Sequence, residues 1–471
     1  MSAETLLASL WQMGGGKPEA LQQLTFSGDT AQLPSTFQVG DVASASIAVQ
    51  ALMAAQLWQD RGGAEQKITV DRRHALAMFK SDRYLSINGK PADDPWNKIA
   101  GYYQAGDGRW IQLHTNFPHH RDGVLAILQC AEERAAVAKA IAGWQAAELE
   151  QVLANADMCA AMIRTEQEWQ THPQALAIAE LSLFEVRKIA DGPVIPLNQG
   201  SGQTPSRPLS GVRVLDLSRV IAAPVGARTL AQHGADVLAI SAAHLPNIML
   251  LVMDTGRGKR SAQLDLRNAG GRQQLHELVR GADVFMQAYR PGAIAQLGYS
   301  VEELCALRPG LIHVSLSAYG HVGPWANRRG FDSLVQSASG IADAEGRAAG
   351  SAVPGKLPFQ ALDHATGYLL AYATMLALQK RAIEGGSWQV RVSLAQTGRW
   401  LQAMSRRGLH EDAAELRPDE IASFLQTSSS GFGEMQAIAP VEKMSLTPAR
   451  LDLPAPTLGQ HAPVWLPRAQ F

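Results

Sequence analysis

Apolar runs that alternate with helical stretches in the second half of the chain constrain its fold more than any other feature. Residues 212–217 are aliphatic and β-branched, and a loop and a helix-like stretch lead from them to a second apolar run at 236–240. The pattern recurs at 282–286 and 311–316, each time after a helical stretch. Strands that alternate with helices predict βαβ units and a parallel sheet. We therefore predict an α/β fold with a doubly wound, mostly parallel sheet.

The loop after the first predicted strand limits what this sheet can bind. Residues 218–224 contain no glycine. Dinucleotide sites need G-x-G-x-x-G at this point, because only glycine lets a pyrophosphate approach the helix end closely. The sheet is thus predicted to be Rossmann-like without that fingerprint, which disfavours a nicotinamide or flavin dehydrogenase.

A polar stretch rich in Gly, Ser and Pro at 198–208 predicts an exposed linker that divides the chain. After it we expect an α/β binding and catalytic domain at 209–400 and a C-terminal tail at 401–471 that returns to it. Before it, residues 91–197 combine a strand that follows a glycine turn with polar helical sequence, which is typical of a smaller α+β domain. Residues 1–90 form a partial repeat.

That repeat relates residues 37–41 to residues 359–363 at a constant offset of 322 (363 minus 41). The match continues without a gap, so that Gly63 falls on Gly385 and Val70 on Val392. In each copy an Asp precedes an apolar, alanine-rich helix, a glycine turn and a strand. The segments between the copies are not repeated, which favours a rearranged chain over a tandem duplication.

Composition excludes several classes of function. The 42 basic and 43 acidic residues nearly cancel, and no long basic run occurs, so neither nucleic-acid nor membrane-surface binding is expected. Cys130, Cys159 and Cys305 lie far apart without metal-ligand spacing, so we predict no metal site and a reducing, cytoplasmic location. We find no signal-peptide pattern and no apolar stretch of membrane-spanning length.

Asp363 is the candidate for chemistry, because it precedes the apolar stretch 365–378. The free N–H groups and the dipole at a helix N-terminus favour an ionised carboxylate, which can act as a nucleophile. From position alone, a role as the N-cap residue is the commoner explanation of Asp363.

Several motifs in the second half add to this interpretation. They are residues 207–219, 222–224, 230–237, 257–260, 264–266, 289–292, 317–324 and 329–332, with Gln336. Together they resemble the family III CoA-transferases, also called the CaiB/BaiF family. The resemblance is close over 207–400, extends to a tail at 445–460, and is weaker over 37–200, which is similar to the family's second domain. Members normally begin with the dinucleotide-fold-like half, so the order here resembles a circular permutation with a duplicated junction.

The resemblance implies that Asp363 attacks an acyl-CoA thioester, giving an aspartyl anhydride and then an enzyme-CoA thioester, from which a second carboxylic acid takes the CoA. It implies acyl-CoA and acid substrates, no tightly bound cofactor, and a homodimer. The CoA-binding residues it implies are Arg219, Ala222, Lys259, Arg260, Tyr289, Tyr319 and Gly320. At 241–243 the sequence is Ser-Ala-Ala where the family often carries an acidic and then a basic residue. Asp41, in the first repeat, is interpreted as a structural relic with an N-cap role.

Racemases of the same family carry a His at the place that Phe331 holds here, which argues for transfer over racemisation. The alternatives are an acyl-CoA racemase or lyase of this family, and a CoA-ester-binding protein without turnover. The scattered histidines, among them His364 and the pair His119 and His120, are more often structural than catalytic. The sequence leaves open the acyl donor, the acceptor acid and whether the dimer is interlocked.

Overall fold

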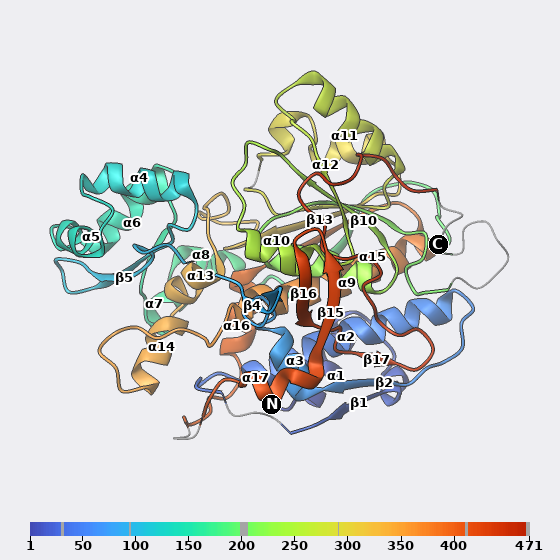
Figure 1. The fold of residues 1–471 in the computed structure, drawn as a ribbon, viewed down its shortest axis with the longest axis horizontal. Coiled ribbons are helices and arrows are strands. Elements are labelled where there is room, and N and C mark those ends of the chain that lie inside the picture. Colours follow the sequence, from blue (N-terminus) through green and yellow to red (C-terminus); the bar gives the residue numbers. More distant parts are fainter. Residues whose placement is uncertain (30–32, 94–95, 198–205, 291, 410–412, 468–471) are drawn as a thin grey trace.

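The predicted parallel sheet lies at the centre of the molecule (Figure 1). The computed structural model describes residues 1–29, 33–93, 96–197, 206–290, 292–409 and 413–467. Within these residues seven strands pair in the order β11-β10-β9-β12-β13-β14-β8, and all neighbours are parallel except β14 and β8. The strands are β8 (Phe184–Ala190), β9 (Arg213–Leu217), β10 (Asp236–Ser241), β11 (Arg260–Gln263), β12 (Val284–Gln287), β13 (Ile312–Ser317) and β14 (Ser387–Ser393).

Helices cover both faces of this sheet, so the predicted doubly wound α/β class is confirmed. Consecutive residues of β9 enter different cores: Val214 packs in the cluster that contains Leu230, whereas Leu215 packs in the one that contains Leu275. This alternation is what a strand buried on both faces requires. The helices of this half are α9 (Ala222–Gln232), α10 (Met249–Gly256), α11 (Ala269–Gly281), α12 (Val301–Leu307), α13 (Asp332–Ala338), α14 (Ile341–Ala348), α15 (Ala361–Glu384) and α16 (Leu394–Gln402), with a 3₁₀ turn at Ala295–Leu297.

Two glycines let α9 and α15 approach closely. A Cβ at Gly367 would lie 2.5 Å from the carbonyl oxygen of Ala222, and a Cβ at Gly226 would lie 2.9 Å from the carbonyl oxygen of Gly367. Both distances are shorter than van der Waals contact, so any larger side chain would push the helices apart. This contact packs the second turn of α15 against the first two turns of α9.

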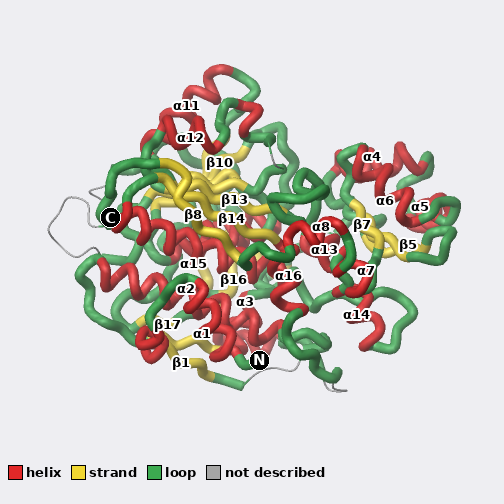
Figure 2. The backbone as a smooth tube through the Cα atoms, turned by 180° about the vertical axis from the view of Figure 1, so that it is seen from behind, coloured by secondary structure: helices red, strands yellow, loops and turns green. Residues whose placement is uncertain are grey.

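The internal repeat forms equivalent elements. In the first copy, α2 (Val39–Asp60) leads to β2 (Ile68–Asp71), which pairs in parallel with β1 (Leu24–Ser27), as β14 pairs with β13. Helices α2 and α15 pack side by side, and α1 (Ala3–Met13) packs on α2 (Figure 2). Although α2 and α15 are long and largely buried, none of the helices searched in the described ranges is apolar enough to cross a membrane.

The segment predicted as a small α+β domain projects to one side in Figure 1. The antiparallel strands β5 (Gly101–Gln104), β6 (Trp110–Leu113) and β7 (Ala160–Met162) pack against α4 (Pro118–Leu128), α5 (Arg134–Ile141) and α6 (Ala146–Asn155). Two short helices, α7 (Glu166–Gln170) and α8 (Pro173–Ile178), lead to β8, which joins the large sheet. The predicted domain boundaries stay a prediction. Strand β8 lies within the predicted small domain 91–197 but belongs to the seven-stranded sheet, so the predicted bounds cut across that sheet. Most of the predicted linker, residues 198–205, lies outside the described residues.

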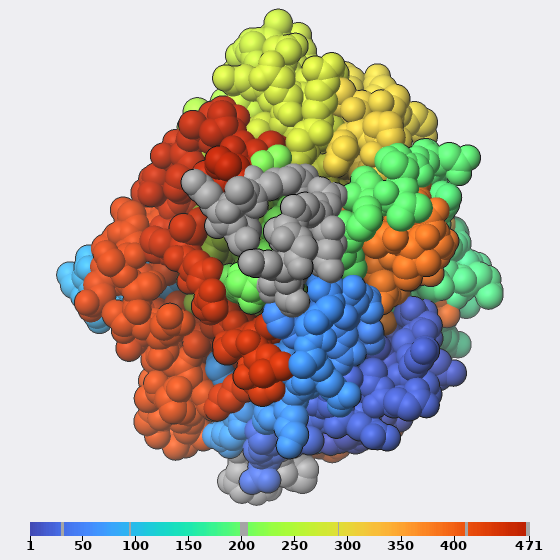
Figure 3. All heavy atoms as spheres, turned by 90° about the vertical axis from the view of Figure 1, so that its right-hand side faces the viewer, coloured from blue at the N-terminus to red at the C-terminus, as the bar shows by residue number. Residues whose placement is uncertain are grey.

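The C-terminal segment packs on both halves of the chain. Hairpin β15 (Leu425–Ser430) and β16 (Gly433–Ile438) extends to β3 (Ser86–Ile87) and β4 (Lys90–Pro91), and β17 (Lys443–Met444) pairs with β2. Figure 3 shows these red and orange residues beside the blue N-terminal ones. Farther on, the N–H of Gly258 donates to the carbonyl of Leu453, which ties the tail to the α/β half. The remaining short elements are α3 (Arg72–Met78), α17 (Pro418–Ile421) and 3₁₀ turns at Pro18–Gln23 and Ala422–Phe424.

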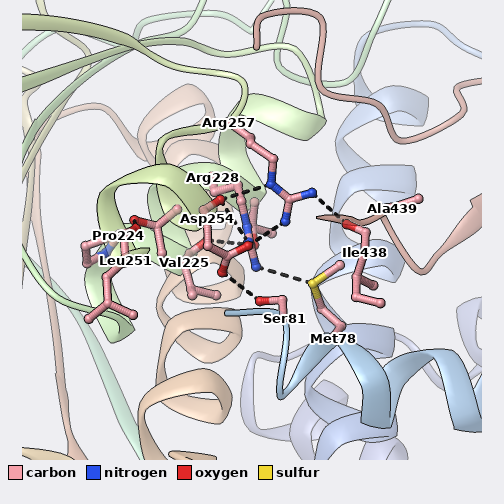
Figure 4. A network of polar contacts seen from close by, with 12 residues as sticks. Met78, Ser81, Pro224, Val225, Arg228, Leu251, Asp254, Arg257, Ile438 and Ala439 are labelled. Carbon is pink, nitrogen blue, oxygen red and sulfur yellow. Dashed lines mark hydrogen bonds and ion pairs between the residues drawn. The ribbon is translucent and has the colours of Figure 1, made fainter. Parts of the chain in front are cut away.

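A buried ionic network joins the first repeat to the α/β half (Figure 4). The carboxylate of Asp254 accepts hydrogen bonds from Arg228 (3.0 Å), Arg257 (2.7 Å) and the hydroxyl of Ser81 (2.7 Å). Burial alone would raise the pKa of Asp254, but the two guanidinium groups hold it at about 2. The turn that contains Ser81 is therefore anchored directly beneath α9 and α10.

Candidate active site

Asp363 lies in the first turn of α15, and its side chain contributes to the walls of two cavities. The helix begins at Ala361 after the N-cap residue Gln360, so Asp363 is its third residue and not its cap. The N-cap explanation is therefore wrong for Asp363. The residue is only 8% exposed, yet it lines cavities of about 920 and 400 Å³. A buried carboxyl group that faces open volume on two sides can reach a ligand in either cavity.

Burial decides the protonation of Asp363. Removal from water raises the pKa of its carboxyl group well above the usual range, and the neighbouring Asp332 and then Asp82 raise it further. The sequence analysis expected the helix N-terminus to favour the ionised form. That effect is worth about 2 kcal/mol at most, and loss of solvation together with two nearby carboxylates outweighs it.

Asp332, at the start of α13, orients the first turn of α15. Its Oδ2 accepts the backbone N–H of Asp363 at 2.8 Å, and its Oδ1 accepts the side-chain amide of Gln336. The other end of that amide accepts the N–H of Leu357 at 2.9 Å. Burial raises the pKa of Asp332 to about 6. We did not assign a role to Asp332 from the sequence, although the motif at 329–332 with Gln336 contained the signal.

The larger cavity lies between the small α+β unit and the α/β half. Phe117, His119, His120 and Cys159 line it from the first, and Arg219, Ala222, Tyr289, Arg290 and Arg329 line it from the second. Arg219 is notable because Nε and Nη2 of its guanidinium group are buried and have no hydrogen-bond partner within the described chain. Buried guanidinium donors are normally satisfied. An anionic ligand in this cavity would satisfy them.

Three of the seven predicted CoA-binding residues, Arg219, Ala222 and Tyr289, therefore line the same cavity as Asp363. Lys259 lies deeper. Its ammonium group donates to Asp216 (2.8 Å) and to the carbonyl of Pro224 (2.9 Å), and it lines a small neighbouring cavity of about 80 Å³. Both partners of the Lys259 ammonium group flank the loop between β9 and α9, so this side chain holds that loop in place and does not line the larger cavity.

The other three predicted CoA-binding residues do not line any of these cavities. Arg260 points to the opposite side of β11, where it pairs with Asp236 (3.0 Å) and donates to the carbonyl of Val464. Tyr319 is buried against Trp325, and Gly320 has a φ of +114° beneath Ile178. The direct-contact prediction is corrected here. Adjacent side chains in a strand point to opposite faces, so only one of two neighbouring cations can face a given cavity.

Three arginines and His244 line the larger cavity and were not assigned from the sequence; one of the arginines, Arg328, directly precedes the motif at 329–332. Arg290 follows Tyr289 within the motif at 289–292, Arg329 opens the motif at 329–332, and His244 follows the Ser-Ala-Ala stretch. The motifs marked the first two positions. Nothing in the sequence singled out His244, since it lies outside all of the quoted motifs.

The paired histidines are part of the cavity wall. His120 lies 3.1 Å from Arg329 and 3.7 Å from the Sγ atom of Cys159. Burial, with the nearby charges of His119 and Arg329, lowers the pKa of His120 to about 3, so its imidazole is neutral. His364, by contrast, is buried and stacks on Phe79, as a structural histidine does.

Asp41, the counterpart of Asp363, lies in a different environment. It is the third residue of α2 after the N-cap Gln38, so its predicted N-cap role is wrong. It is 4% exposed, forms an ion pair with Arg407, and lines none of the cavities described above. Only one of the two repeated carboxyl groups therefore combines burial with open volume.

Comparisons with known proteins show which family the chain is similar to. The sequence profile of CoA-transferase family III matches residues 20–196 and 209–418. An acetyl-coenzyme A transferase, nodX of Hypoxylon pulicicidum, is 34% identical over 44% of this chain and 35% of its own length. An acyl-CoA transferase of Gibberella moniliformis is 24% identical over 81% of this chain and 74% of its own. The beta subunit of a succinyl-CoA–L-malate CoA-transferase from Chloroflexus aurantiacus is 32% identical over 42% and 51%.

Among solved structures, Rv3272 of Mycobacterium tuberculosis is similar, with 33% identity and a TM-score of 0.39 over 42% of this chain and 57% of its own. A CAIB/BAIF family protein from Brucella suis has 27% identity and a TM-score of 0.39 over 49% and 65%. The match to most of these relatives spans from a third to two thirds of their length.

Proposed function

The chain belongs to CoA-transferase family III, and we propose that it moves CoA from an acyl-CoA thioester to a carboxylic acid through Asp363. One observation carries the proposal: Asp363 lines two cavities, and the larger is also lined by Arg219, two of whose buried guanidinium donors have no hydrogen-bond partner within the described chain. Covalent exchange at one carboxylate needs access for a thioester and for an acid, and this position offers both.

Because burial favours the protonated form of Asp363, the proposed reaction starts when this group releases its proton to solvent, and the resulting carboxylate attacks the thioester carbonyl. The C–S bond breaks, CoA leaves as a thiolate, and a mixed anhydride forms. The thiolate then attacks the aspartyl carbonyl, which releases the donor acid and leaves CoA on Asp363. The acceptor carboxylate displaces CoA to form a second anhydride, and the thiolate attacks its acyl carbonyl to give the new acyl-CoA. Each step exchanges one acyl bond for another, so no oxidant or net proton is required.

We assign CoA to the larger cavity. Its volume of about 920 Å³ is at the upper end of the range for small-molecule sites. The guanidinium groups of Arg219, Arg290 and Arg329 would meet the phosphates, because a fork of N–H donors matches phosphate oxygens. Ala222 and Tyr289 would border the pantetheine arm. For Lys259 we propose a positioning role through Asp216 and Pro224.

Other parts of the interpretation stay predictions. They are the permuted order of the halves, a homodimer, a cytoplasmic location and the absence of a tightly bound cofactor. The relatives are named for acetyl-CoA and succinyl-CoA, so short acyl groups are the first donors to try.

The test is to trap the intermediate. Incubation with an acyl-CoA and hydroxylamine should convert one aspartate to its hydroxamate, which peptide mass spectrometry locates. We expect the modified peptide to contain residue 363 and the modification to disappear in Asp363→Asn. Asp41→Asn is the matched control, since it changes the equivalent carboxyl group of the first repeat, and it should still be modified. A hydroxamate at Asp41 or Asp332 would contradict the mechanism.

A racemase remains the second candidate for one reason. His114 lines the smaller cavity with Asp363, and burial lowers its pKa to about 4, so its neutral imidazole could accept a proton. A racemase would exchange the α-proton of a 2-methylacyl-CoA with deuterium oxide in the absence of any acceptor acid. A transferase would not. Binding of CoA esters with neither reaction would leave the non-catalytic alternative.

A further inference from the structure

The second cavity beside Asp363 is built from parts of the chain that the larger cavity does not use. Lys80, Asp82 and Arg83 come from the turn after α3, His114 and Asn116 from the small α+β unit, and residues 356–360 from the loop that enters α15. Its volume is about 400 Å³, enough for roughly a dozen water molecules. This space is large enough for a short acid and has less than half the volume of the larger cavity.

The two cavities share four lining residues, and all but one of them are apolar. Val220, Ile221, Phe331 and Asp363 line both. The ring of Phe331 stacks on His114 with centroids 3.8 Å apart, which fixes the position of the ring. Asp363 is thus the one ionisable side chain that the two described cavities share. A thioester whose carbonyl lies at Asp363 would direct its acyl group from the larger cavity toward the smaller one.

The loop at 356–360 is held in place against the catalytic carboxyl group. Gln336 accepts the N–H of Leu357 and donates to Asp332, and Asp332 accepts the N–H of Asp363. One chain of hydrogen bonds therefore fixes both the nucleophile and the loop that faces it. Lys356 directly precedes Leu357, so the same hydrogen bonds hold its backbone beside the smaller cavity.

Charges in the smaller cavity leave one cation without a counterion. Lys80 pairs with Glu415, and Arg83 pairs with Asp82. The carboxylate of Asp332 is used by the backbone N–H of Asp363 and by Gln336. Within the described ranges, no carboxylate lies within ion-pair distance of Lys356, whose side chain is exposed and lines the cavity.

We infer that the smaller cavity holds the acyl group and then the acceptor acid, and that Lys356 selects acids with a second carboxylate. This inference rests on the proposed function and deepens it. The reacting carboxyl group would lie at Asp363 and the distal one at the Lys356 ammonium group. A monocarboxylic acid of the same length would leave Lys356 facing an alkyl end.

The experiment compares succinate with butyrate as acceptors, because the two have the same chain length and differ in the distal carboxylate. We expect kcat/KM to favour succinate, and Lys356→Met to reduce the succinate-to-butyrate ratio about tenfold, as the loss of one charge-assisted hydrogen bond predicts. Lys356→Arg should retain most of the preference. Lys139→Met, at an exposed position of α5 that lines none of these cavities, is the control and should not change the ratio.

Two failures can be told apart. If Asp363 forms the hydroxamate and either acid accepts CoA, but the ratio is unchanged in Lys356→Met or butyrate is preferred by the unmodified protein, the inference about Lys356 is wrong and the transferase stands. If no hydroxamate forms and neither acid accepts CoA, the proposed function itself fails.

Discussion

Replacement of Asp363 by Asn should make the protein more stable and inactive, and the gain in stability should grow with pH. The carboxyl group is buried beside Asp332, and both facts raise its pKa well above the usual range. The folded state therefore keeps a proton that the unfolded state releases above the ordinary aspartate pKa of about 3.9. Stability that is fully present below this pH is lost as the pH rises toward the raised pKa. Asn cannot ionise and removes that loss.

The size of the effect follows from proton linkage. One proton of difference between the folded and unfolded states changes the free energy of unfolding by about 1.4 kcal/mol per pH unit. Between pH 5 and pH 7, the advantage of Asp363→Asn over the unmodified protein should therefore grow, by at most about 3 kcal/mol. Below about pH 4 the two proteins should be equally stable. Loss of the nucleophile should lower kcat at least about a thousandfold.

Urea unfolding at pH 4, 5, 6 and 7, followed by circular dichroism, measures the difference. Asp254→Asn provides a control of opposite sign, because burial would raise the pKa of Asp254 but Arg228 and Arg257 hold it at about 2. That variant leaves two buried guanidinium groups without their partner and should lose roughly 3–5 kcal/mol at pH 7. If Asp363→Asn is less stable than the unmodified protein at pH 7, or if its gain is independent of pH, the carboxyl group is not buried as described.

Three further variants test other parts of the site. Arg219→Met should raise the KM for acyl-CoA about tenfold in a steady-state assay, because it removes two buried donors that have no hydrogen-bond partner within the described chain. Arg260→Met is the control and should leave this KM unchanged. Gln336→Leu should lower kcat about tenfold and the free energy of unfolding by roughly 1–3 kcal/mol, because the N–H of Leu357 loses its acceptor. If kcat is equal in both proteins, Gln336 does not position the catalytic residues. Gly367→Ala should lower the free energy of unfolding by about 1–3 kcal/mol through the clash with Ala222, and an unchanged melting temperature would show that α9 and α15 can separate.

Much of the α/β half could be predicted from the sequence. The apolar runs at 212–217 and 236–240 became adjacent parallel strands, because β-branched residues buried on both faces leave a periodicity that local sequence records. The repeat at an offset of 322 (363 minus 41) placed Asp41 and Asp363 at the same point of equivalent helices. Family motifs marked the loops that surround Asp363.

Helix boundaries and side-chain directions could not be predicted as well from the sequence. The sequence placed Asp363 before its helix, but α15 begins two residues earlier at Ala361. It grouped Lys259 with Arg260, yet one supports the loop after β9 and the other pairs with Asp236. Neighbouring residues share a sequence environment, but their partners lie on different segments of the fold.

The sequence by itself determined the class of fold, the family and the carboxyl group around which the site is built, because these depend on local patterns and on motifs that short segments carry. Only the tertiary structure decided the protonation of that carboxyl group and the shape of its surroundings. Arg219 and Asp332 lie far from Asp363 in the chain, and their proximity to it depends on how helices and loops pack. Lys356 is close to Asp363 in the sequence, but only the packing shows that it lines the same cavity. Burial and unpaired charge are properties of that packing, so they exist only once the chain has folded.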